Sequence, residues 1–171
     1  RRMLNHYGTA MGKALAVFIN NDSAYQTAFE YADAGIKVVC VVDSRQYPSQ
    51  ALLDGCASRN IPVHTQAVVT KAYGWQAVKG IEIADLAAHG ESVSHRRTVK
   101  CDVLAHSGGW TPQVQMASHG GQAPIYDENI AAFLVDDQAP DTYSVGAVEG
   151  ENGLLKGVIQ ACDAATAACA F

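Results

Sequence analysis

Short, continuous apolar runs recur in the first sixty residues and again near residue 100. Residues 14–19, 36–42 and 61–64 are apolar and rich in β-branched side chains, and residues 102–107 return to the same type. Runs of this length, bounded by polar residues, are typical of strands that are buried on both faces. They predict four strands of a parallel sheet.

Amphipathic stretches separate the first three of these runs. Residues 24–34 and 49–60 have helical spacing of apolar positions. Ser23 and Gln26 are spaced as a capping box, and Gly35 stands where a left-handed residue ends a helix. The order strand–helix–strand–helix–strand predicts right-handed crossovers and one mononucleotide-binding half.

The spacing of apolar and polar positions changes in the middle of the chain. Residues 67–71, 76–86 and 93–101 alternate as antiparallel strands do, with breaks at 73–74 and 89–91. We therefore expect a three-stranded antiparallel layer. The predicted fold is α/β: a Rossmann-like parallel sheet with helices on both faces, plus this layer.

The last third of the chain is less regular. Residues 113–141 have a loop-rich composition, residues 143–146 predict a last short strand, and residues 153–170 predict a long helix. Cys162 and Cys169 lie seven positions apart on this helix, which favours core packing over chemistry.

Composition narrows the class of protein. The chain has 171 residues, 49% hydrophobic and 17% charged, and its net charge is −5. This composition excludes intrinsic disorder, and the negative charge argues against nucleic-acid binding. We find no run of the length that a membrane span needs and no signal peptide. The five cysteines are odd in number and include no C-x-x-C, so we expect free thiols in a reducing cytoplasm.

The turn after the first strand is the first candidate site, at Asn20, Asn21, Asp22 and Ser23. A dinucleotide fingerprint has glycines here, so that the backbone can approach a pyrophosphate. This chain has no glycine in the turn, and Asp22 puts a carboxylate where a phosphate prefers to sit. A degenerate nucleotide fold is favoured over a working nucleotide site, and both interpretations stay open.

Other candidate positions follow later strands. Asp43 ends the second strand and is either a ribose-binding acid or a solvated strand-end acid. Gly146 and Ala147, and the segment 107–110, also follow apolar runs, where ligands of open α/β sheets gather. Trp110 is interpreted as a core or interface anchor.

No pattern predicts catalysis or metal binding. The six histidines lack metal-ligand spacing, and there is no G-x-S-x-G elbow. We therefore expect no catalytic residue and no metal ligand in this chain.

Several motifs occur together along nearly the whole chain. They are Leu4–Gly8, Phe18–Tyr25 with its Asn-Asn-Asp-Ser, Val41–Asp43, Cys101–Ala105, Ser107–Trp110 with its Ser-Gly-Gly-Trp, Tyr126–Glu128, Ala131–Phe133 and Val145–Ala147. In this combination the chain resembles the α subunit of heterotetrameric sarcosine oxidase. More distantly, it resembles glutathione- and thioredoxin-reductase-like flavoproteins.

The resemblance implies an architecture in which a second nucleotide domain is inserted into a first. Residues 1–115 then form a degenerate dinucleotide-binding-like domain, with its antiparallel layer at about 67–101. Residues 116–171 return to the first domain, which would lie upstream. The chain starts without Met and stops within a helical pattern, so we expect a piece of a longer chain.

The resemblance also implies a function. Such enzymes oxidatively demethylate sarcosine to glycine and release hydrogen peroxide, with FAD in the β subunit, FMN at the α/β interface and NAD in the α subunit. The site residues that it implies are Gly146 and Ala147 and the 20–23 turn. Expected partners are other subunits of a hetero-oligomeric oxidase. The alternatives are a structural module without a ligand and the α subunit of a related amine, opine or proline dehydrogenase.

The long helix carries one more expectation. Its apolar face needs a partner surface, and in isolation it favours association between copies. We therefore expect the isolated chain to form a dimer or a higher oligomer.

Overall fold

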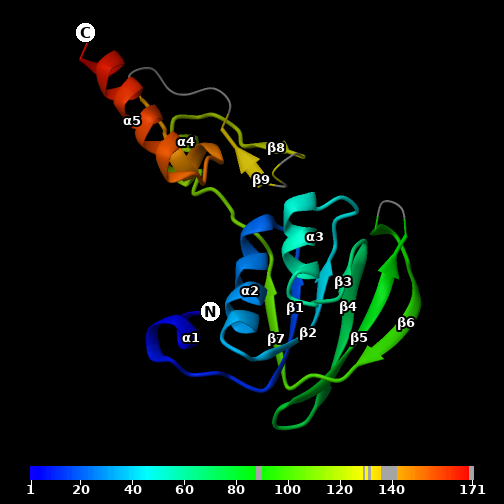
Figure 1. Ribbon diagram of the computed structural model, residues 1–171. Helices are drawn as coiled ribbons and strands as arrows, with labels where there is room; N and C mark the ends of the chain where they lie inside the picture. Colours follow the sequence, from blue (N-terminus) through cyan, green and yellow to red (C-terminus); the bar gives the residue numbers. More distant parts are fainter. Residues whose placement is uncertain (88–89, 129, 131, 136–141, 170–171) are drawn as a thin grey trace. The chain divides into compact units, whose positions relative to one another are not determined.

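The computed structural model describes residues 1–87, 90–128, 130, 132–135 and 142–169. The chain divides into two compact units, Arg1–Gly109 and Trp110–Phe171, and each is described by itself. Figure 1 shows the elements of both units.

A four-stranded parallel sheet forms the centre of the first unit. Its strands are β1 (Ala14–Ile19), β2 (Lys37–Asp43), β3 (Val63–His64) and β7 (Val103–Ser107), in the order β3-β2-β1-β7. All four predicted strands are confirmed, but β3 and β7 lie at the edges of the sheet and are only partly buried. β-Branched and apolar side chains suit these positions because both faces of β1 and β2 are covered.

The helices of this unit are α1 (Arg2–Tyr7), α2 (Tyr25–Asp33) and α3 (Gln50–Ala57), and a 3₁₀ turn, η1 (Asp22–Ala24), leads into α2. Gly35 follows α2 with φ of +77°, as the sequence predicts. The predicted capping box is wrong. The side chain of Asn21 accepts the hydrogen bond from the Ala24 backbone N–H, because the 3₁₀ turn moves the cap two positions upstream of Ser23.

The antiparallel layer is confirmed with shifted ends. It consists of β4 (Ala67–Gly74), β5 (Val78–Leu86) and β6 (Val93–Val99) in the order β4-β5-β6. The first predicted break is wrong, because Tyr73 and Gly74 pair with β5 and the turn comes at 75–77. In the second predicted break, residue 89 lies outside the described residues.

Two apolar clusters hold the first unit together. One lies between the parallel sheet and α2 and α3, and the other lies between the parallel sheet and the antiparallel layer. The α/β class is therefore confirmed, but among the described residues helices cover one face only. The antiparallel layer covers the other face, where the sequence predicts helices (Figure 1).

Three cysteines belong to these clusters. Cys40, Cys56 and Cys101 are buried and free. Burial raises the pKa of Cys40 and that of Cys56 to about 11, so both thiols stay protonated near pH 7.

The second unit contains α4 (Gln115–Ser118), the hairpin β8 (Ile125–Asp127) and β9 (Ala132–Leu134), the 3₁₀ turn η3 (Gly146–Glu149) and α5 (Leu154–Ala168). The predicted long helix is confirmed over the described residues. The predicted strand at 143–146 is wrong: this stretch forms no strand and runs into η3, where Gly146 has φ of +70°. The core positions predicted for Cys162 and Cys169 are also wrong, since both side chains are exposed.

No helix in the described part of the chain is long and apolar enough to cross a membrane.

Candidate functional site

The strand order brings three turns to one edge of the parallel sheet. β2 and β7 flank β1 on opposite sides, so the chain adds β2 and β3 on one side of β1 and β7 on the other, and the strand order reverses between β1 and β7. The turns that begin at Asn20, Ser44 and Gly108 follow β1, β2 and β7 at their carboxyl ends. This is the place where open α/β sheets bind ligands.

Side chains of the chain itself span the gap between β1 and β7. The Asn20 amide donates to the Gly108 carbonyl at 3.0 Å, and the Asn21 amide donates to Ser107 Oγ at 3.0 Å. The Gly109 N–H points at the same Oγ at 3.4 Å, in a backbone conformation with φ of +89°. The two turns are therefore tied to each other.

The Asn21 side chain also caps the 3₁₀ turn that leads into α2. Its Oδ1 accepts from the Ala24 backbone N–H at 3.1 Å and from Ser23 Oγ at 2.8 Å. A free N–H at a helix start is what attracts a phosphate. Here a side-chain oxygen already satisfies the Ala24 N–H.

Asp43 is fully buried at the end of β2. Its Oδ1 accepts from the Arg45 backbone N–H at 2.9 Å and from Arg45 Nε at 3.1 Å, and its Oδ2 accepts from Arg45 Nη2 at 2.8 Å and from the Tyr25 hydroxyl at 2.9 Å. The side chain is therefore not a solvated strand-end acid. Burial and the Asp43 carboxylate raise the pKa of Tyr25, which stays a donor.

Arg45 links this acid to the first turn. Its Nη1 donates to Asp22 Oδ1 at 2.7 Å, while the rest of the guanidinium holds Asp43. The hydrogen bond to the Asp43 carboxylate has the largest effect on the pKa of Arg45 and raises it. The hydrogen bond to Asp22 raises this pKa further, whereas burial lowers it. Asp22, which the sequence places at the helix start, thus ends as one half of an exposed ion pair.

This arrangement does not fit a bound dinucleotide. The acid that would bind a ribose makes four hydrogen bonds inside the protein, and the Ala24 N–H is bonded to Asn21. The side chains of Asn20 and Asn21 lie where a fingerprint has bare backbone. Sequence reasoning places the 20–23 turn and Asp43 at one edge of the sheet. It misses Arg45 and Tyr25. For Arg45 the sequence offers one signal, an arginine two positions after a strand-end acid.

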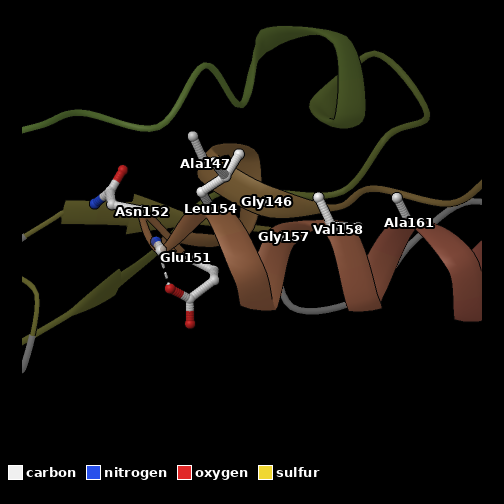
Figure 2. A pocket seen from close by; sticks show the side chains of 9 residues that line it. Gly146, Ala147, Glu151, Asn152, Leu154, Gly157, Val158 and Ala161 are labelled. Atoms are coloured by element: carbon white, nitrogen blue, oxygen red, sulfur yellow. Dashed lines mark hydrogen bonds between the residues drawn. The ribbon is translucent and has the colours of Figure 1, made fainter.

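Gly146 and Ala147 lie in the second unit, at a hollow of about 320 Å³ beside the start of α5 (Figure 2). Three glycines line it, and a Cβ on Gly157 would come within 3.8 Å of Gly146 Cα. The Gly146 N–H donates to Gln160 Oε1 at 2.9 Å. The side chains of Leu154, Val158 and Ala161 point to one side of the helix.

Glu151 occupies the start of α5. Its Oε1 accepts from the Gly153 N–H at 2.6 Å, the bond drawn in Figure 2. This backbone bond and Lys156 lower the pKa of Glu151, so the helix start carries a negative charge at neutral pH. An anion at this point meets a carboxylate.

Trp110, which the sequence predicts to be a core or interface anchor, is mostly exposed. No group of three or more metal-ligating side chains comes together among the described residues.

Comparison with known proteins places the chain in a family context. No protein-family model matches it. It is 33% identical over 154 residues to the sarcosine oxidase subunit alpha of Rhizobium meliloti (strain 1021), a match that covers 90% of this chain and 14% of that protein. It is 32% identical over 174 residues to the sarcosine oxidase subunit alpha of Corynebacterium sp. (strain P-1), with 98% and 18% covered. This chain is a relative of the sarcosine oxidase α subunit.

The resemblance seen in the sequence is thereby confirmed, and the chain spans less than a fifth of the length of these α subunits. Among solved structures, the chain is similar to thioredoxin reductase from T. acidophilum, with a TM-score of 0.66 and 22% identity over 89% of this chain and 50% of that one. This similarity confirms a thioredoxin-reductase-like fold.

Proposed function

We propose that this chain is the nucleotide-binding-like scaffold of a sarcosine-oxidase-type α subunit, and that it carries no catalytic residue itself. The parent enzyme would demethylate sarcosine oxidatively to glycine with release of hydrogen peroxide, using FAD and FMN held outside this chain. The relatives named sarcosine oxidase subunit alpha support the family part of this proposal.

The scaffold role rests on one observation: the polar groups at the sheet edge bind each other. Asp43, the position for a ribose-binding acid, is buried and receives hydrogen bonds from Arg45 and Tyr25. A ligand would have to displace these bonds and leave a buried carboxylate without its partners, which costs several kcal/mol. The edge is therefore better suited to holding β1, β2 and β7 together than to holding NAD.

A second candidate function is NAD binding at the hollow beside α5. The glycines at 146, 153 and 157 favour it, because backbone without side chains lets a ligand approach closely. Glu151 and Gln160 disfavour it, since they occupy the Gly153 and Gly146 N–H groups.

Native mass spectrometry of the purified chain, followed by calorimetric titration with NAD, tests the scaffold proposal. We expect the bare protein mass and no binding up to about 1 mM NAD, which corresponds to a binding free energy weaker than about 4 kcal/mol. Bound NAD that protects residues 20–24 from hydrogen exchange would contradict the proposal.

Bound NAD that protects residues 146–158 would support the second candidate. Gly157→Val should then abolish binding, because its side chain fills the hollow against Gly146. Ala167→Val is the matched control on an exposed position near the other end of α5. The oxidase activity is tested separately, by sarcosine-dependent peroxide release from the complete parent complex.

A further inference from the structure

The chain passes from the first unit to the second shortly after the end of β7. The first unit ends at Gly109 and the second begins at Trp110. The last pair of the ladder between β1 and β7 is Ile19 with Ser107. Gly108 and Gly109 therefore lie beyond this ladder, at a boundary where connecting segments are usually exposed and flexible.

Two asparagine side chains from the turn after β1 hold this segment. The Asn20 amide donates to the Gly108 carbonyl at 3.0 Å. The Asn21 amide donates to Ser107 Oγ at 3.0 Å and to Asn20 Oδ1 at 3.1 Å, which uses both of its N–H groups. A helix cap needs only the Asn21 oxygen, which accepts from the Ala24 N–H. The two N–H groups of Asn21 therefore serve a second purpose, the contact with the end of β7.

Gly109 has the backbone conformation that this contact needs. Its φ is +89°, and a Cβ there would lie 3.2 Å from Asn20 Oδ1, closer than an ordinary van der Waals contact. Its N–H points at Ser107 Oγ at 3.4 Å. Gly108 differs, since it has no positive φ and a Cβ there would meet open space. The need for glycine therefore falls on the residue that packs against Asn20, which is expected of a fitted contact and not of a loose loop.

We propose that Asn20 and Asn21 form a clamp on the segment 107–109, so that any pivot between the two units begins at Trp110 and not at the end of β7. The turn after β1, where a dinucleotide fingerprint has glycines, then fixes the place where the chain leaves the first unit. This role rests on the proposed scaffold function, because a pyrophosphate at this turn would need the space that the two side chains fill.

Hydrogen–deuterium exchange in the complete parent complex tests the clamp, because the exchange rate of a protected amide follows its local opening. Asn20→Asp keeps the size of the side chain but places a carboxylate oxygen against the Gly108 carbonyl oxygen, where the amide now donates. We expect the amides of residues 107–110 to exchange about tenfold faster, the upper end of the loss of one hydrogen bond. The amides of residues 103–105 and of β2 should keep their rates.

Asn5→Asp is the matched control. The Asn5 amide also donates one hydrogen bond to an oxygen, Glu30 Oε2 at 2.7 Å, and the substitution makes the same change of charge away from the clamp. It should leave the exchange of residues 107–110 unchanged. Ser107→Ala is a second variant that introduces no charge. It removes the oxygen that accepts from Asn21, and it should speed the exchange of the same amides by about two- to tenfold.

Three results would overturn the clamp. The first is a wild-type segment 107–110 that exchanges at the rate of an unprotected chain, and the second is an unchanged rate in both variants. The third is a rise spread evenly over the first unit, because that reports a general loss of stability. NAD that binds and protects residues 20–24 contradicts the scaffold function instead, and exchange measured without NAD still decides on the clamp.

Discussion

Replacing Arg45 by methionine should destabilise the first unit by about 2–3 kcal/mol. The substitution keeps much of the apolar stem but removes the guanidinium that neutralises Asp43, which has no exposed surface. Removing one partner of a fully buried pair costs about 3–5 kcal/mol. The Arg45 side chain is 33% exposed, so water replaces part of what is lost and the expected cost is lower.

Urea denaturation at pH 7, followed by far-ultraviolet circular dichroism, measures this cost. Asp22→Asn is the matched control, because it removes the other, exposed contact of Arg45 and should cost less than about 1 kcal/mol. A double-mutant cycle of Arg45→Met with Asp43→Asn should give a coupling energy above about 1 kcal/mol. If Arg45→Met costs no more than Asp22→Asn, the carboxylate is not held by Arg45 and the argument for an internally satisfied edge fails.

Three further predictions concern other parts of the chain. Gly109→Ala should cost about 1 kcal/mol in the same denaturation assay because its φ is +89°, whereas Gly108→Ala, with open space and no positive φ, should be neutral. Burial lowers the pKa of His64 below 6.5, so stability should fall as the pH drops below 6.5, and His64→Gln should remove that part of the slope. The isolated chain should associate through the exposed face of α5, so light scattering should show a mass above that of one chain. The double substitution Leu155→Glu with Ile159→Glu should reduce this mass, and a monomeric wild-type chain would refute the prediction.

The parallel sheet could be predicted from the sequence because its central strands, β1 and β2, are apolar runs with both faces covered. Val41 and Val42 belong to different clusters on opposite faces, so the sheet needs apolar residues at successive positions. A buried strand of this kind does not reveal what covers it. The sequence therefore predicts helices on both faces, but Ile81 and Ile83 of the antiparallel layer cover the second face.

The candidate site could be located but its chemistry could not. Chain order and strand ends bring Asn21 and Asp43 to one edge, which is a matter of topology. The bond between Arg45 and both carboxylates depends on rotamers and on the angle of the loop after β2, and no spacing in the sequence encodes these. The predicted helix cap at Ser23 is wrong for a similar reason. Ser23 and Asn21 are both good cap residues, and the 3₁₀ turn, which the sequence does not reveal, selects Asn21.

The wrong predictions in the second unit have a different cause. The helical spacing of apolar residues indicates a helix with one apolar face. α5 forms as predicted, from Leu154 onward. Periodicity cannot state which surface covers that face, and Leu154 and Leu155 are 84% and 74% exposed. Cys162 and Cys169 lie on this helix and are exposed among the described residues, as is the apolar face that the sequence expects to need a partner surface. Only Pro112 and Ala132 are buried apolar residues among the described residues after Gly109. The helical spacing of apolar residues in α5 therefore indicates a surface that needs a partner, not a surface that is buried within this unit.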